Sequence, residues 1–277
     1  MTELLRLEHI NFQYEERYPA LKNVSALLHE GERIAVLGNN GAGKSTFFLC
    51  CNGVLQPQSG RIFLKGREIS KKDVAMLRQS VGLVFQDPDS QIIAGTVENE
   101  VSFGPMNLRL DRGEVERRVT QSMNRMNLEG YQKRAPQYLS GGEKKRVSIA
   151  DILAMEPDMI LFDEPTASLD PENVEALEQT LSSLNQSGIT VVVSTHDVDF
   201  AYRFASRAIV FSQGEVIADD EIDEVFSSDA ILSKAGLKKP LLYSAAEMLE
   251  RRFPGIPSVP KPKSVNELRE LINDLPF

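Results

Sequence analysis

The 277-residue sequence contains no tryptophan, three histidines and two cysteines. Cys50 and Cys51 are adjacent, so they offer no disulfide framework and are expected to be small buried residues of a reducing compartment. His9, His29 and His196 are too widely spaced to predict a metal cage. No apolar run approaches the roughly 20 residues that cross a bilayer, so we expect a chain that neither spans a membrane nor carries an export signal.

The sequence also lacks an excess of positive charge. Its net charge at pH 7 is -9 and its pI is about 5.1. An acidic chain of this kind does not present the broad basic surface that binds nucleic acid, although its charge does not exclude a local basic patch. We therefore expect no nucleic-acid partner. The 277 residues are enough for one large domain, alone or with a small appendage, and their core needs no disulfide.

A glycine-rich segment is the most informative motif that is present. Residues 38–46 read GNNGAGKST and follow the apolar run Ile34–Leu37, which predicts a strand, a loop and the start of a helix. Backbone N–H groups and the positive helix end of such a loop surround phosphates, the lysine reaches the β and γ phosphates, and the serine hydroxyl binds Mg²⁺. The spacing predicts ATP or GTP binding, the alternative being a glycine turn in an unrelated α/β protein. The expected nucleotide contacts are Gly38, Asn39, Asn40, Gly41, Ala42, Gly43, Lys44, Ser45 and Thr46, with Ser45 also on Mg²⁺.

The pattern of apolar residues changes along the chain. Alternation and frequent turns before about residue 70 predict antiparallel strands. Short apolar runs separated by helix-length segments then predict a parallel sheet covered by helices, and these runs are Val81–Phe85, Met159–Phe162 and Val191–Val193. Between Gln86 and about Ala154 strand signals are absent, and Asp111 with Glu114 marks a helix start. We interpret this stretch as a helical insertion with an ordinary valine and methionine core.

The last fifty residues have the pattern of an appendage. Ser244 with Glu247, and Ser264 with Glu267, have the spacing of capping boxes, and the prolines between them exclude one continuous helix. We therefore predict two short helices. The second has an apolar stripe that must be covered by its own subunit or by a second copy of the chain, formed by Val265, Leu268, Leu271, Ile272 and Leu275.

Two acidic residues follow a predicted buried strand. Asp163 and Glu164 come directly after the run Met159–Phe162, at the edge where open α/β sheets bind ligands. We expect Asp163 to hold Mg²⁺ through water and Glu164 to orient and deprotonate the water that attacks the nucleotide. The alternative is a pair of solvated acids at a strand end. The predicted activity is therefore hydrolysis of the bound nucleotide.

A second anion-binding motif lies between the glycine-rich segment and the two acids. Residues 139–143 read LSGGE, in which a serine and two glycines open a helix and offer free N–H groups to a phosphate. With this motif, the chain from Leu4 to about Val225 resembles the nucleotide-binding subunit of an ATP-binding-cassette (ABC) transporter. The resemblance implies that Ser140, Gly141, Gly142 and Glu143 of one subunit close over the γ-phosphate held by another, so that a symmetric dimer forms two composite sites. Glu143 stands where the family most often has glutamine, which leaves its contribution open.

The resemblance assigns roles to four further residues. Gln86 matches the glutamine that contacts Mg²⁺ and the attacking water, and His196 matches the histidine that contacts the γ-phosphate. Asp170 matches the loop that crosses the dimer interface. Tyr14 matches the aromatic residue that stacks on adenine, although Tyr18 is close enough to take that place and an edge-strand aromatic is often only packing.

One stretch narrows the subfamily. Residues 85–91 read FQDPDSQ and residues 101–107 read VSFGPMN. Both are similar to the energy-coupling-factor importers, in particular the cobalt-type ATPases, although from physics alone Asp87–Asp89 is equally a solvated turn. The resemblance implies an ATPase that uses ATP and Mg²⁺ at the cytoplasmic face of the membrane, bound to a second ATPase subunit and to integral membrane coupling and substrate-binding subunits. Cobalt, nickel and a vitamin all remain open as the substrate.

The expected fold is α/β, a P-loop ABC cassette with an antiparallel β subdomain, a RecA-like parallel core sheet, a helical insertion and a small helical C-terminal extension. We place the ATPase domain at residues 1–225, its helical subdomain at about 87–154 and the extension at 226–277. Two alternatives remain: the ATPase of a conventional importer fed by a binding protein, and a soluble ABC ATPase of DNA repair. The second would carry long heptad segments, which residues 86–139 lack.

Overall fold

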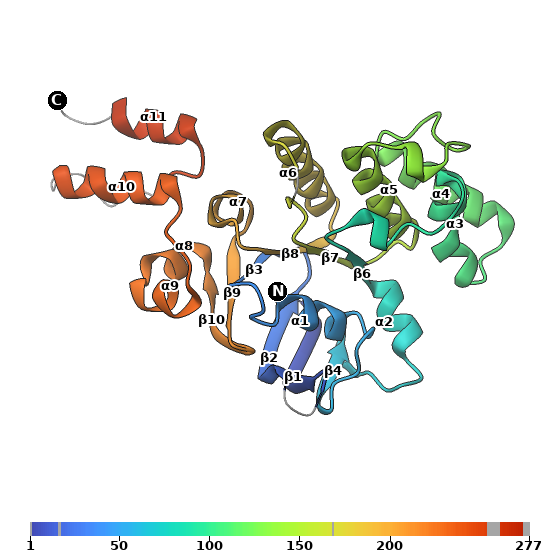
Figure 1. Ribbon diagram of the computed structural model, residues 1–277, viewed down its shortest axis with the longest axis horizontal. Coiled ribbons are helices and arrows are strands. Elements are labelled where there is room, and N and C mark those ends of the chain that lie inside the picture. The colour runs from blue at the N-terminus through green and yellow to red at the C-terminus, as the bar shows by residue number, and fades with distance from the viewer. Residues whose placement is uncertain (1, 16–17, 168, 254–260, 274–277) are drawn as a thin grey trace.

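The computed structural model describes residues 2–15, 18–167, 169–253 and 261–273, and Figure 1 shows its arrangement of two sheets and their helices. The first sheet is antiparallel and has the strand order β2-β1-β4-β5. Its strands are β1 (Glu3–Gln13), β2 (Pro19–His29), β4 (Ser59–Leu64) and β5 (Arg67–Glu68). The prediction of antiparallel strands at the start of the chain is confirmed.

The second sheet has the strand order β10-β9-β3-β8-β7-β6, in which all strands but β10 run parallel. Its strands are β3 (Arg33–Leu37), β6 (Val81–Val84), β7 (Met159–Asp163), β8 (Thr190–Thr195), β9 (Arg207–Ser212) and β10 (Glu215–Glu221). The predicted parallel sheet is confirmed. Because parallel strands share a direction, the carboxyl ends of β3, β7 and β8 meet at one edge.

Both faces of the parallel sheet are covered, which explains why the middle of each of its parallel strands is apolar. In β3, Ile34 and Val36 face the core shared with the antiparallel sheet, whereas Ala35 and Leu37 face the core under the remaining helices. Helix α1 (Lys44–Cys51) lies in the first core, and its Cys50 and Cys51 are fully buried. Their burial, predicted from the sequence, is confirmed, and it raises the pKa of both thiols, that of Cys50 to about 12.

Between β6 and β7 the chain contains only helices and turns. They are the 3₁₀ turns Pro88–Ser90 and Pro136–Tyr138 and the helices α3 (Val97–Asn107), α4 (Arg112–Arg125) and α5 (Gly141–Ala154). Asp111 caps α4 as expected, since its carboxylate accepts a 3.1 Å hydrogen bond from the Glu114 N–H. Val119, Met123 and Met126 are buried in the core, so the interpretation of the valine and methionine stripe as ordinary core is confirmed.

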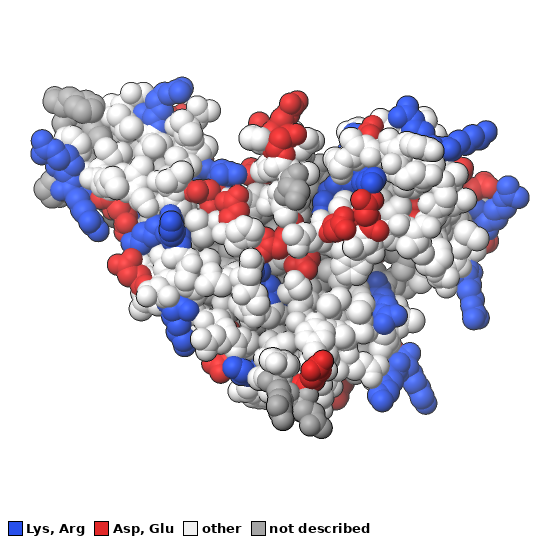
Figure 2. Space-filling model, in the orientation of Figure 1, with Lys and Arg blue, Asp and Glu red and all other residues white. Residues whose placement is uncertain are grey.

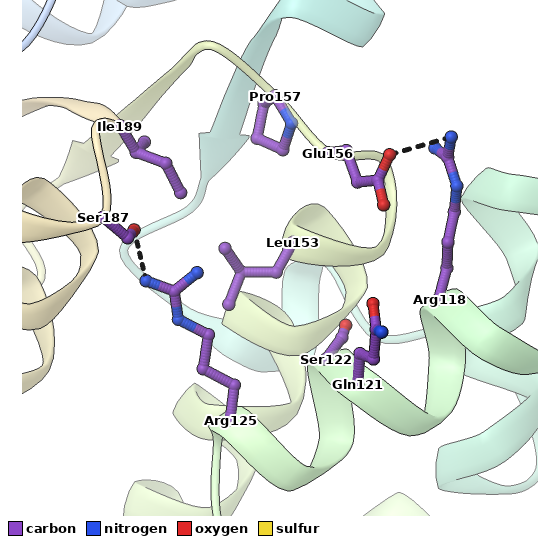
Figure 3. Close-up of a pocket in the computed structure, with 9 residues that line it drawn as sticks. All are labelled: Arg118, Gln121, Ser122, Arg125, Leu153, Glu156, Pro157, Ser187 and Ile189. Carbon is purple, nitrogen blue, oxygen red and sulfur yellow. Dashed lines mark hydrogen bonds and ion pairs between the residues drawn. The ribbon is translucent and has the colours of Figure 1, made fainter.

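A cavity of about 280 Å³ separates α4 and α5 from the start of β8. Figure 3 shows Arg125 of α4 reaching Ser187, which follows α6 (Pro171–Gln186), and Arg118 reaching Glu156. Polar contacts across this cavity therefore link the helical segment to the residues beside β7 and β8.

After β10, the described residues form four short helices. They are α8 (Ile222–Ser227), α9 (Asp229–Ala235), α10 (Leu241–Arg252) and α11 (Val265–Asn273). Both predicted helices therefore exist, but the predicted start of the first is wrong: α10 begins at Leu241, so Ser244 lies inside it. The backbone N–H of Leu241 is capped by Asp199, which belongs to α7 (Val198–Phe204), and Glu247 pairs instead with Lys239. A partner distant in the sequence has replaced the local cap.

The cap of α11 is as predicted. The hydroxyl of Ser264 accepts a 3.1 Å hydrogen bond from the Glu267 N–H. On the apolar stripe, Leu268 and Leu271 are partly buried, whereas 64% of Val265 is exposed. Leu275 lies outside the described residues.

The surface carries acidic side chains over α6 on the face shown in Figure 2, while Lys and Arg side chains are scattered over that face. Among the described side chains of that face, no broad basic surface forms. One further helix, α2 (Val74–Ser80), precedes β6. Within the described ranges, no helix is both long enough and apolar enough to cross a bilayer.

Candidate functional site

The glycine-rich segment lies between β3 and α1, as its sequence predicts. Gly38, Gly41 and Gly43 all have positive φ angles, of 144°, 77° and 109°. A Cβ atom at Gly38 would lie 2.4 Å from the carbonyl oxygen of Phe211, so only glycine fits there. The Lys44 side chain is 6% exposed and folds back over the loop, where its ammonium donates a 2.7 Å hydrogen bond to the Gly38 carbonyl. The loop thus holds a desolvated cation beside its free N–H groups.

Glu164 follows β7 and joins three elements of the site. One of its carboxylate oxygens, Oε1, lies 3.3 Å from the Lys44 ammonium, and the other, Oε2, lies 2.9 Å from Nδ1 of His196. His196 comes directly after β8, so the sheet edge brings together three residues that are distant in the sequence. Although Oε1 is buried, it has no hydrogen-bond partner in the described part of the chain. This oxygen can therefore accept a proton or a hydrogen bond from a bound molecule.

Asp163 is the last residue of β7 and lies in register with Ser194 of β8. Its carboxylate accepts a hydrogen bond from the Ser194 hydroxyl. Ser45 and Gln86 are exposed, so they can contact a ligand. Among the described residues, no cluster of three or more His, Cys, Asp or Glu side chains could hold a metal ion by itself. The hydroxyl, amide and carboxylate oxygens of Ser45, Gln86 and Asp163 nevertheless suit Mg²⁺ that arrives with a nucleotide.

Lys145 is a residue that our sequence reasoning missed. It lies on α5, is 4% exposed, and its ammonium donates hydrogen bonds to the carbonyls of Phe85 (3.1 Å) and Gln86 (2.7 Å). Burial lowers its pKa to about 8, against the opposing attraction of Asp87 and Asp163. The sequence did hold a signal, because Lys145 occupies the same helix face as the apolar Ile149, four residues later.

Two more contacts bind the segment after Gln86 to α5. The Gln91 amide accepts a hydrogen bond from the Phe85 N–H (3.2 Å) and donates one to the carbonyl of Ser148 (3.0 Å). Lys144 forms a 2.6 Å ion pair with Asp89. With Lys145, these contacts attach residues 85–91 to the helix that Ser140 begins. Asp87–Asp89 is therefore more than a solvated turn, because α5 holds it.

Ser140 caps α5 in a complete capping box. Its hydroxyl accepts a hydrogen bond from the Glu143 N–H (3.3 Å), and the Glu143 carboxylate accepts one from the Ser140 N–H (2.7 Å). The Tyr131 hydroxyl donates a further 2.7 Å bond to that carboxylate, and these bonds hold the pKa of Glu143 below its usual value. The glutamate therefore fixes the serine within its own chain. Next to it, a Cβ at Gly141 would meet nothing within 4 Å, so this face of the helix end is open.

The LSGGE motif, residues 139–143, and the phosphate loop, residues 38–46, lie apart in this chain. Figure 1 shows α5 beside α3 and α4, away from α1, and no hydrogen bond or ion pair between described residues joins 140–143 to 38–46. Asp170 is also outside the Lys44 cluster, because it caps α6 by accepting the Asn173 N–H at 2.9 Å. The structure thus places Glu164 and His196 beside Lys44 of the phosphate loop and leaves residues 140–143 and Asp170 outside this cluster.

Tyr14 lies beside the phosphate loop. Its hydroxyl is 3.2 Å from the hydroxyl of Thr46, while 58% of the residue is exposed. Its ring packs edge-on against Phe12. Tyr18 is 68% exposed, and no described contact joins it to the loop. Of the two aromatic candidates, Tyr14 is therefore the one that the structure places at the loop.

Comparison with known proteins gives a consistent result. Residues 21–167 match the family described as ABC transporter. The energy-coupling factor transporter ATP-binding protein EcfA2 of Methanospirillum hungatei is 42% identical over 274 residues, which are 98% of this chain and 69% of the relative. EcfA of Methanothermobacter thermautotrophicus is 44% identical over 250 residues, which are 90% of this chain and 79% of the relative.

Solved structures show the same likeness. The structure of cbiO1 from Clostridium perfringens, part of the ABC transporter complex cbiONQ, is 37% identical, with a TM-score of 0.75 over 90% of this chain and 100% of that one. The ATP-binding cassette MJ0796, in a dimeric post-hydrolysis state with ADP and Pi, is 30% identical, with a TM-score of 0.70 over 79% of this chain and 99% of that one. The expected fold class is thereby confirmed. With a matched family model, relatives above 40% identity and a common fold, the chain belongs to the ATP-binding proteins of ABC transporters and is an ATPase of that family.

Proposed function

We propose that this chain is the ATP-hydrolysing subunit of an energy-coupling-factor importer that takes up a transition metal ion, cobalt or nickel, or a vitamin. The observation that carries the proposal is the Lys44–Glu164–His196 cluster at the phosphate loop, found in a chain whose relatives are named energy-coupling factor transporter ATP-binding proteins. The chain would work at the cytoplasmic face of the membrane, where it binds integral coupling and substrate-binding subunits.

The first half of the reaction site belongs to one chain. Residues 38–46 would bind the ATP phosphates, and Tyr14 would stack on adenine. The Lys44 ammonium would exchange its ion pair with Glu164 for contacts with the phosphates. Bound Mg²⁺, held by Ser45, Gln86 and Asp163, would neutralise charge on the phosphates. Once the Lys44 ammonium has moved to the phosphates, Glu164 would take a proton from the attacking water through Oε1, and His196 would contact the γ-phosphate.

The second half would come from a partner ATPase subunit, either an identical chain or a paralogue. Ser140, Gly141 and Gly142 would bind the γ-phosphate of the other subunit, Glu143 would hold Ser140 in place, and Asp170 would lie at the interface. The separation of these residues from the phosphate loop within one chain supports this arrangement. Hydrolysis removes the shared anion, so the dimer relaxes and residues 85–91 move with α5.

We assign residues 1–225 to the ATPase domain, about 87–154 to its helical subdomain and 226–277 to a C-terminal helical extension. The absence of strands between β6 and β7 supports the range assigned to the helical subdomain. The contact between Asp199 and Leu241 supports an extension that is docked on the ATPase domain.

A transport assay tests the proposal. The chain is co-expressed with the membrane subunits of an energy-coupling importer, the complex is placed in vesicles, and ATP-driven uptake of Co²⁺, Ni²⁺ and vitamins is measured. We expect uptake of one substrate, abolished by Lys44→Ala. ATP hydrolysis without uptake of any of these substrates, or hydrolysis stimulated only by an extracellular binding protein with its own membrane subunits, would contradict the proposal and favour a conventional importer.

The composite site can be tested by mixing two inactive variants. Lys44→Ala disables the phosphate loop of its own chain. Ser140→Arg disables the LSGGE motif, which contacts the nucleotide bound by the partner chain. If sites are composite, a mixed dimer has one site with both defects and one intact site, so mixing restores part of the activity. If each chain holds a complete site, mixing restores none. Assaying each variant alone supplies the baseline.

A further inference from the structure

Ser194 lies where the two acids of the site meet β8. It is fully buried, and its hydroxyl makes two hydrogen bonds. It donates to the Asp163 carboxylate and accepts from the Glu164 N–H at 3.0 Å. A single side chain thus holds both acids at once.

The two hydrogen bonds of the Ser194 hydroxyl fix its orientation. A serine hydroxyl has one proton to donate, and here that proton goes to Asp163. Its lone pairs then face the Glu164 N–H. The other residues of the strand core, Val191–Val193, are apolar and fully buried, so a hydroxyl at this position would be destabilising without such partners.

The same residue supports an unusual backbone conformation. Glu164 has a φ of 42°, in the left-handed region that residues other than glycine seldom occupy. Its N–H bonds to the Ser194 carbonyl at 3.1 Å as well as to the hydroxyl. This conformation places the Glu164 carboxylate within 3.3 Å of Lys44 and 2.9 Å of His196.

We propose that Ser194 is a positioning residue for ATP hydrolysis. Its hydroxyl fixes the Asp163 carboxylate and the Glu164 backbone relative to each other, so that the Glu164 carboxylate is held in position for the attacking water. The inference rests on the proposed roles of Asp163 and Glu164. It adds to them a residue from the neighbouring strand that touches neither the water nor the phosphates.

Three substitutions and a matched control test the role. Ser194→Ala removes the hydroxyl, Ser194→Cys fills the same space with a poor hydrogen-bonding group, and Ser194→Thr keeps the hydroxyl. Thr190→Val is the control, because Thr190 is equally buried on the same strand and its hydroxyl also makes two bonds, with the Gly31 N–H (2.9 Å) and the His29 carbonyl (3.2 Å). It lies at the opposite end of β8 from the acids.

We expect kcat to fall about tenfold to hundredfold in Ser194→Ala and Ser194→Cys, with the Kd for ATP within about threefold of the parent, because a small displacement of a catalytic group slows the chemical step. Ser194→Thr and Thr190→Val should keep kcat within about threefold, by the same reasoning. In the nucleotide-free chain, hydrogen exchange at the Glu164 amide should accelerate in Ser194→Ala and not in Thr190→Val. A kcat within twofold of the parent in Ser194→Ala, or an equal loss in Thr190→Val, would overturn the proposal.

Glu164→Gln separates this inference from the function on which it rests. If Glu164→Gln keeps full turnover, the general-base assignment is wrong whatever Ser194 does. If Glu164→Gln loses turnover but Ser194→Ala keeps it, the positioning role alone is wrong. The double variant should lose less than the product of the two single losses, because Ser194 acts through Glu164. Multiplicative losses would contradict that route.

Discussion

Replacement of Glu164 by glutamine should slow ATP hydrolysis and at the same time strengthen ATP binding. The change keeps the size of the side chain but removes its negative charge and its ability to take a proton. Loss of a general base slows turnover by about 10²–10⁴-fold, which corresponds to about 2.7–5.4 kcal/mol in the barrier.

The effect on binding follows from the Lys44–Glu164 ion pair. At the 3.3 Å between Lys44 Nζ and Glu164 Oε1, direct attraction at an effective dielectric of about 20 is about 5 kcal/mol, most of it offset by desolvation of the two buried groups. ATP must compete with this pair for the lysine. A residual competition of about 1–2 kcal/mol would make ATP bind about 5–30-fold more tightly to Glu164→Gln.

The assay combines single-turnover phosphate release with equilibrium binding of a fluorescent ATP analogue. Glu156→Gln is a suitable control, because Glu156 is exposed and pairs with Arg117 and Arg118 away from the loop. We expect the control to match the parent in both measurements. Turnover of Glu164→Gln within tenfold of the parent would refute the general-base role, and weaker ATP binding would refute the competition for Lys44.

Two further predictions concern α5. Lys145→Met should lower turnover about tenfold with little change in ATP affinity, because the Gln86 carbonyl loses its hydrogen-bond donor. Lys144→Met breaks only the ion pair with the exposed Asp89 and should change turnover less than twofold. Equal effects of the two substitutions, measured by steady-state ATPase assay, would exclude the special role of Lys145. Burial, reinforced by the neighbouring Glu100, raises the pKa of Asp151 to about 7, so the stability that its protonated form contributes is complete below about pH 4 and is lost as the pH rises through 7. From pH 6 to pH 8 the parent should therefore lose about 1.4 kcal/mol of unfolding free energy relative to Asp151→Asn in urea titrations, and parallel pH profiles would contradict the shift.

Local patterns predicted the parts of the site that depend on adjacent residues. The phosphate loop, the two acids after β7 and the Ser140 helix start each occupy a few consecutive residues, so their spacing alone was informative. The apolar runs predicted the parallel sheet because its strands are covered on both faces.

Contacts between distant residues were beyond that reasoning. The Ser194 hydroxyl contributes only because β8 pairs with β7 in the register Asp163↔Ser194, which no single segment encodes. Lys145 donates a hydrogen bond to the carbonyl of Gln86, 59 residues earlier in the chain, and Asp199 caps the helix start for which the sequence offered Ser244. In each case tertiary packing supplied a partner that competed with, or added to, the local one.

Two chains are expected to complete each ATP site. The decisive measurement is ATP hydrolysis per chain over a wide range of chain concentrations, at saturating ATP and Mg²⁺, alongside the dimer fraction from sedimentation. We expect hydrolysis per chain to rise with the dimer fraction and to vanish where the chain is monomeric. Full hydrolysis per chain at concentrations where only monomer is present would contradict it.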